Sequence, residues 1–136
     1  MLLFQRMMYR VDLRMNPSVY YLMGDNEERR GQGGQAAEMR GEPNMIGIRT
    51  KRSPGRDEPA YWSDADFERQ AYLLDEDFQK VADIMVMDML SIVVCPLDVT
   101  GTKQGLGTGM SELGKRAPRT LAYIERWVDI LKGIQS

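Results

Sequence analysis

Glycine and small polar residues gather directly after an apolar run near the start of the chain. The run Val19–Met23 is followed by Gly24, Asp25 and Asn26, and then by three loop glycines, Gly31, Gly33 and Gly34. Glycine adopts positive φ and lets a ligand approach the backbone, and free N–H groups between a strand and a helix bind phosphate and other anions. The spacing predicts an anion site here, with a ligand-free surface loop as the alternative.

The charge of the chain is uneven although its formal total is only −2. Between residues 29 and 56, seven Arg and Lys side chains stand against two Glu side chains, which leaves −7 for the remainder. A basic segment around a glycine loop suits a small anionic ligand. The overall field predicts neither nucleic acid nor a membrane surface as a partner.

The absence of His is the most useful negative observation. It removes Ser-His-Asp and Cys-His catalysis, and with a single cysteine, Cys95, it makes a zinc site improbable, so we expect no metal and no cofactor. One cysteine permits no intrachain disulfide, which fits a reducing compartment. The chain has no apolar run long enough to cross a bilayer and begins without a signal-peptide pattern, so we expect a cytoplasmic protein.

Strand and helix patterns alternate along the 136 residues. The pattern predicts an edge strand from Leu2–Phe4 and Met7–Leu13, and further strands at Val19–Met23, Met45–Thr50 and Ser91–Cys95. It predicts helices at Gly34–Arg40, from an N-cap at Ser63 to about Met89, and at Arg116–Lys132. We therefore expect one α/β domain over residues 1–136, with a parallel or mixed sheet covered by helices on both faces.

In such sheets ligands bind beyond the carboxyl ends of the strands. The segments that follow Met23, Arg49 and Cys95 should therefore converge on one crevice. The residues predicted to bind ligand there are Gly24, Asn26, Arg30, Gly31, Gly33, Gly34, Gln35, Thr50, Lys51, Gly105, Gly107 and Gly109. Tyr61 and Trp62 either stack on a base or cover the core.

The order of these motifs resembles the macro domain and its divergent phage and bacterial relatives. The resemblance rests on the Gly-Asp-Asn turn, the Gly-x-Gly-Gly-Gln-Ala loop and the Arg-Gly-Glu-Pro-Asn block, and on Ile92–Pro96 leading to Gly105–Gly109. It covers roughly Val19–Lys51 and Ser91–Lys132. A Rossmann domain is disfavoured because the glycines miss the G-x-G-x-x-G spacing, and no Walker A motif is present.

The resemblance implies a three-layer macro-like fold with a mixed sheet, and binding of ADP-ribose or a related signalling nucleotide, cyclic nucleotides included. Asn26 and the glycines of residues 31–34 would match the first ligand loop, and Gly105–Gly109 the second. For phage-like relatives it also suggests a protein that sequesters or processes a host nucleotide signal. The charged insert Glu27–Arg30 and the lack of an equivalent for the acidic adenine-binding residue leave the exact nucleotide open.

Two other functions stay open. One is hydrolysis of an ADP-ribosyl or phosphate bond, with Asn26 orienting water and Asp25 or Asp98 as the base. The other is a protein-binding adaptor whose glycine loops are only turns. Without His, and with Arg and Lys side chains around the crevice that would lower the pKa of a carboxylic acid, we favour a binder over an efficient hydrolase. A homo-oligomer also stays open.

Overall fold

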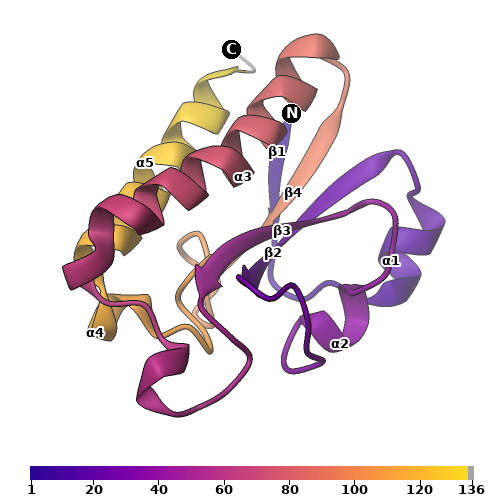
Figure 1. Cartoon of the computed structure of the whole chain (residues 1–136). Helices are drawn as coiled ribbons and strands as arrows, with labels where there is room; N and C mark the ends of the chain where they lie inside the picture. Colours follow the sequence, from indigo (N-terminus) through magenta and orange to yellow (C-terminus); the bar gives the residue numbers. More distant parts are fainter. Residues whose placement is uncertain (135–136) are drawn as a thin grey trace.

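The fold is built on a four-stranded sheet that lies between two layers of helices. The computed structural model describes residues 1–134 (Figure 1). The strands, in spatial order, are β1 (Leu2–Gln5), β4 (Ile92–Pro96), β2 (Val19–Asn26) and β3 (Met45–Lys51), and every pairing between them is parallel. The sequence predicts either a parallel or a mixed sheet, and the described strands form a parallel sheet.

The helices divide between the two faces of the sheet, which confirms the three-layer α/β architecture (Figure 1). One face carries α1 (Arg10–Met15) and α2 (Ala36–Met39), and the other carries α3 (Phe67–Met87) and α5 (Pro118–Ile134). The chain steps in one direction from β1 to β2 and β3 and then returns to β4. Since parallel crossovers are right-handed, the return connection must use the opposite face. Shorter turns are the 3-10 helices η1 (Glu58–Ala60) and η2 (Asp64–Asp66) and the helix α4 (Leu113–Arg116).

Two apolar cores lie on opposite sides of the sheet because successive strand residues face opposite sides. Leu22 and Ile48 meet Leu74 and Phe78 of α3 and Ile124 of α5 in the larger core. The smaller core comprises Met8, Leu13, Tyr21, Met23, Ala36, Met39 and Val94. The spacing of three and four residues along α3 explains its buried face.

The sequence prediction differs from the structure at the start of the chain and at one helix terminus. The predicted edge strand is confirmed at β1, but the prediction is wrong for Met7–Leu13, where α1 begins at Arg10. Leu13 is apolar because that helix packs it against the smaller core. Ser63 precedes η2 and not the long helix, and its side chain makes no capping hydrogen bond.

A chain of ion pairs covers the open edge of β3. We call Asp25, Asp77, Arg29, Arg40 and Arg49 the edge network. Arg29 donates to the Gly47 carbonyl at 2.7 Å, and Asp77 accepts from the Arg49 backbone N–H at 2.7 Å. These are outward-facing backbone groups of an edge strand, which would otherwise invite another strand to pair.

The network also joins α3 to the loop that follows β2. Arg29 bridges two buried carboxylates, Asp77 at 2.7 Å and Asp25 at 3.4 Å, and Arg40 approaches Asp25 to 2.7 Å. Arg29 has a φ of 54°, which is uncommon for a residue with a Cβ. The ion pairs hold it there, and they set the path of the loop at the carboxyl end of β2.

The edge network predicts that Gly47→Ala destabilises the protein. A Cβ at Gly47 would lie 2.5 Å from Asp25 Oδ2 and 2.8 Å from Arg29 Nη1, so the ion pairs would have to move. We expect a loss of about 1–3 kcal/mol in the free energy of unfolding, measured by urea denaturation. Gly133→Ala is the matched control because a Cβ there meets nothing within 4 Å. Equal urea midpoints for Gly47→Ala and the unsubstituted protein would contradict the role assigned to Gly47.

Candidate functional site

A two-part cleft lies at the carboxyl ends of the strands, on either side of Gly24. The strand β2 leads to α2 on one face, whereas its neighbours β3 and β4 lead to helices on the other face. The exit loops therefore diverge around the end of β2, which is where open α/β sheets bind ligands. The β3-side pocket has a volume of about 460 Å³ and the β4-side pocket about 680 Å³, with their open mouths included.

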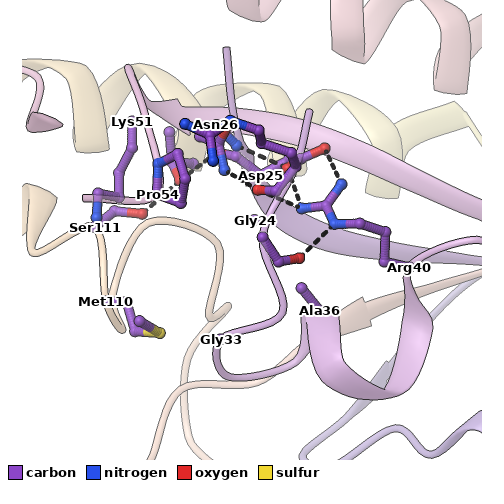
Figure 2. Close-up of a pocket in the computed structure, with 13 residues that line it drawn as sticks. Gly24, Asp25, Asn26, Gly33, Ala36, Arg40, Lys51, Pro54, Met110 and Ser111 are labelled. Carbon is purple, nitrogen blue, oxygen red and sulfur yellow. Dashed lines mark hydrogen bonds and ion pairs between the residues drawn. The ribbon is translucent and has the colours of Figure 1, made fainter. Parts of the chain in front are cut away.

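The two pockets share a common wall. Both are lined by Gly24, Gly33, Ala36, Met110 and Ser111. A Cβ built on Gly33 would lie 3.1 Å from the Met110 Cε atom, so the flexible thioether rests against this glycine. Figure 2 shows the β3-side pocket, with Lys51 and Ser111 toward one end and Arg40 toward the other. We refer to both pockets together as the cleft.

The structure brings all twelve residues that the sequence predicts to bind ligand into the lining of this cleft. Gly24, Asn26, Arg30, Gly31, Gly33, Thr50 and Lys51 line the β3-side pocket, and Gly24, Gly33, Gly34, Gln35, Gly105, Gly107 and Gly109 line the β4-side pocket. Their placement follows from the parallel sheet, which puts the ends of β2, β3 and β4 at one edge. The ligand itself stays a prediction.

The glycine loop from residue 31 to residue 35 leaves its backbone donors unused. Within residues 1–134, no hydrogen bond is formed by the N–H groups of these five residues. Positive φ at Gly31 and Gly34, 108° and 55°, allows the loop to turn sharply between β2 and α2. Arg40 holds the loop by donating to the Gly31 carbonyl at 2.7 Å and to the Arg30 carbonyl at 3.3 Å (Figure 2). The carbonyls are thus bound, and the N–H groups remain available for an anion.

Asp25 is held by arginines and has no free oxygen at the pocket. Its Oδ1 accepts from Arg40 and from the Asn26 backbone N–H at 2.7 and 2.8 Å, and its Oδ2 lies 3.4 Å from both Arg29 and Arg40. A carboxylate that balances two guanidinium groups positions the loop. These contacts leave it poorly placed to take a proton from water.

Asn26 and Asp98, the other two residues considered for catalysis, close turns. The Asn26 amide donates to the Arg30 carbonyl at 2.7 Å, and its oxygen accepts from the Glu28 N–H at 3.0 Å. Asp98 accepts from Thr100 Oγ1 at 2.8 Å and lines a different pocket, beside α5. The structure therefore does not bring Asp98 to Asp25. Asp and Asn close turns with their own neighbouring backbone, and sequence alone does not separate this role from catalysis.

Lys51 differs from the arginines near the cleft in having no carboxylate partner. Arg30 pairs with Glu28, Arg40 with Asp25 and Arg52 with Asp66, but within residues 1–134 no carboxylate lies within 4.0 Å of the Lys51 ammonium. Its Nζ donates to the Gly55 carbonyl at 2.8 Å, and the residue is buried, with 6% of its surface exposed. Burial lowers the pKa of Lys51. The charges of Arg56 and Arg116 also lower it, whereas the charge of Glu112 raises it by a smaller amount than burial lowers it.

Hydroxyl groups from two distant segments meet beside Lys51. Thr50 Oγ1 and Ser111 Oγ are 2.5 Å apart, and Thr50 also donates to the Asp25 carbonyl at 3.2 Å. This contact ties the loop after β4 to the end of β3. Sequence reasoning placed Arg40 among the cations around the crevice, but it missed Ser111 and Met110, because nothing in their local sequence marks them as neighbours of β2.

Neither aromatic residue considered for base stacking is open to a ligand. Trp62 is buried in the larger core, and its indole N–H donates to Glu27 at 2.8 Å. Tyr61 lies beneath two cations, with Arg116 Cζ 3.6 Å and Lys51 Nζ 4.4 Å from the ring centroid. Gln35 is also engaged, since its side chain bonds both backbone groups of Met8 and so fixes the loop after β1.

Glu27 makes the loop after β2 sensitive to acid. Burial raises the pKa of Glu27, but hydrogen bonds from Arg69 and Trp62 outweigh it and hold the pKa below the ordinary value of 4.5. A carboxylate with a lowered folded-state pKa stabilises the fold above its unfolded pKa, and this stability is lost as pH falls through the folded value. We expect Glu27→Gln to flatten the fall in stability below pH 4.5, measured as thermal midpoints against pH. The matched control is Glu125→Gln on α5, and an unchanged acid profile in Glu27→Gln would refute the prediction.

Cys95 is predicted to be unreactive in the folded protein. Burial in the larger core raises the pKa of its thiol to about 12, so thiolate is scarce at pH 8. Iodoacetamide should modify Cys95 in urea but not in buffer, as followed by intact mass. Equal rates in both solvents would show that the thiol is exposed.

Comparison with known proteins gives one match. The model of a family of unknown function (DUF7831) matches residues 3–127. No curated protein and no solved structure matches the chain. Within residues 1–134, no helix has the length and apolar character that a membrane crossing requires. The match includes every residue that lines the cleft, and the chain belongs to this family of unknown function.

Proposed function

We propose that the protein binds ADP-ribose or a related signalling nucleotide in the cleft around Gly24. The observation that carries this proposal is that, within residues 1–134, the backbone N–H groups of residues 31–35 form no hydrogen bond, on a loop that lines the β4-side pocket together with a second glycine loop. Consecutive free N–H groups in a turn suit the oxygens of a phosphate or diphosphate. The resemblance to macro domains points to the same ligand class.

The charge and polar groups of the cleft fit this ligand class. The enclosed space of the two pockets is about 90 and 200 Å³, and neither alone reaches the roughly 300–1,000 Å³ usual for a small-molecule pocket, so the ligand would have to span both. Lys51 supplies a cation with no carboxylate within 4.0 Å among residues 1–134, beside the hydroxyls of Thr50 and Ser111. A nucleotide phosphate would give this ammonium group an anionic hydrogen-bond partner.

The contacts of the acidic residues favour binding over hydrolysis. Asp25 is engaged by Arg29 and Arg40, Asn26 by its own loop, and Asp98 lies in a separate pocket. A general base must reach the proton that it abstracts. We therefore propose a binder, of the type that sequesters a nucleotide signal in the cytoplasm as phage relatives are expected to do, rather than a hydrolase or a ligand-free adaptor.

Calorimetry against a nucleotide panel tests the proposal. The panel is ADP-ribose, cyclic ADP-ribose, ADP, AMP and cyclic dinucleotides, and any ligand that binds is recovered after heat denaturation and analysed for cleavage. We expect saturable binding of at least one diphosphate or cyclic nucleotide, recovered intact. An adaptor would give no heat with any of them, and recovery of a cleaved product would support the hydrolase.

Two substitutions test whether binding occurs in the cleft. Lys51→Met keeps an unbranched side chain, one atom shorter, and removes a charge-assisted hydrogen bond to the ligand, so affinity should fall by about tenfold or more. Gly33→Val should abolish binding without unfolding the protein, because Gly33 does not have a positive φ and its nearest neighbour is the flexible end of Met110. Gly133→Val, at the far end of α5, is the matched control and should bind normally. Unchanged affinity in a folded Gly33→Val protein would exclude this site.

A further inference from the structure

The β4-side pocket is a glycine-rich part of the cleft with a positively charged lining. Among the described residues that line it, none is acidic, and the one charged side chain belongs to Arg6, which follows β1. The β3-side pocket differs, because its lining includes the carboxylate of Asp25. An anionic group that enters the β4-side pocket therefore meets a cation in the lining and no carboxylate.

The two glycine loops of this pocket have unpaired backbone donors and paired backbone acceptors. At Gly33, Gly34, Gly107 and Gly109, no N–H group forms a hydrogen bond within residues 1–134, whereas each carbonyl oxygen accepts one. The carbonyl oxygens are bound by N–H groups farther along the chain, at Ala36, Ala37, Leu113 and Glu112. Buried backbone groups rarely remain unpaired unless water or a ligand binds them. The backbone groups that these glycines still offer are donors, which suits an anion.

Arg6 is held beside the pocket by contacts that leave its charge without a counter-ion. Its Nη2 donates to the Val99 carbonyl at 3.0 Å, and within residues 1–134 no carboxylate lies within 4.0 Å of its guanidinium group. A Cβ built on Gly101 would lie 3.0 Å from the Arg6 Cδ atom, so the stem of the side chain rests against this glycine. A guanidinium group has five N–H donors and stays charged at physiological pH. Arg6 therefore retains donors for a ligand in this pocket.

We propose that the β4-side pocket binds a terminal phosphate group and that Arg6 is the cation that binds it. This inference rests on the proposed function, since it specifies which kind of nucleotide the cleft takes. A terminal phosphate has three unsubstituted oxygens and about 1.5–2 negative charges near pH 7. Two of these oxygens suit the paired donors of a guanidinium group, and the third is left for the N–H groups of the loops.

The size of the pocket favours a terminal phosphate over one that links two larger groups. The enclosed space is about 200 Å³, below the roughly 300 Å³ at which small-molecule pockets usually begin, so it suits a phosphate better than a base with its sugar. A phosphate that links two groups, as in ADP-ribose, has fewer free oxygens and must continue on both sides. The ligand class is therefore a nucleotide with a terminal phosphate, such as ADP.

Calorimetry with ADP and ADP-ribose tests this inference, because both contain a diphosphate and only ADP ends in a phosphate. Inorganic phosphate is the third probe, and all titrations are made at one ionic strength in a buffer without phosphate. The variants are Arg6→Gln, which removes the charge, and Arg6→Lys, which keeps the charge but not the paired donors. Arg126→Gln, at an exposed position on α5 that does not line the cleft, is the matched control.

We expect ADP to bind at least about tenfold more tightly than ADP-ribose. Arg6→Gln should weaken ADP by about tenfold and ADP-ribose by less than about twofold, Arg6→Lys should fall between, and Arg126→Gln should bind both normally. Inorganic phosphate should compete with ADP in the unsubstituted protein and much less in Arg6→Gln. Unchanged ADP affinity in a folded Arg6→Gln protein, or equal weakening of ADP and ADP-ribose, would overturn the inference.

The terminal-phosphate site and the proposed function fail in different ways. Binding of ADP-ribose with no gain in affinity for ADP would remove the terminal-phosphate site and leave the nucleotide-binding function. Binding of inorganic phosphate that depends on Arg6, without binding of any nucleotide, would keep the phosphate site and remove the function proposed above.

Discussion

The sharing of Asp25 between Arg29 and Arg40 is the interaction on which the cleft depends. A carboxylate this deeply buried is costly unless it is paired, and removing a partner from such a group typically costs about 3–5 kcal/mol. Asp25 is therefore a structural residue that holds the glycine loop in place through its arginine partners, and it is a poor candidate for catalysis. Arg40 extends from this point to the loop carbonyls, and Arg29 extends to Asp77 on α3.

This arrangement explains why a strongly basic segment does not produce a strongly basic site. Most arginines of the segment from residue 29 to residue 56 form ion pairs with carboxylates. The arginines of the edge network also cover the unpaired backbone groups of β3. In the cleft, positive character comes from backbone N–H groups, from the buried Lys51 and from Arg6 and Arg30 at the pocket lining. Such a site selects between ligands by the positions of their anionic groups more than by their net charge, since backbone N–H groups and a single ammonium act at short range.

Glycine has separate roles in the two parts of the molecule. At Gly47 the missing side chain makes room for the edge network, where a Cβ would meet Asp25. At Gly105 a Cβ would meet the Leu97 carbonyl, so the second loop can pass close to the end of β4. Both positions serve the packing of the protein itself, whereas Gly33 in the cleft is open enough to accept a side chain.

The sequence by itself determined the α/β class, the three principal strands and the long helices, because these follow from local periodicity and breakers such as Pro96 and Gly41. It also determined which loops lie at the cleft, since parallel strands place their carboxyl ends together. It did not determine the roles of Asp25, Asn26 and Asp98. Turn closure, ion pairing and catalysis use the same residue types, and only contacts with Arg40, Arg30 and Thr100 distinguish them. Tertiary structure alone decided that no carboxylate within residues 1–134 pairs with Lys51, because the fold sets neighbouring acidic side chains such as Glu112 against arginines instead.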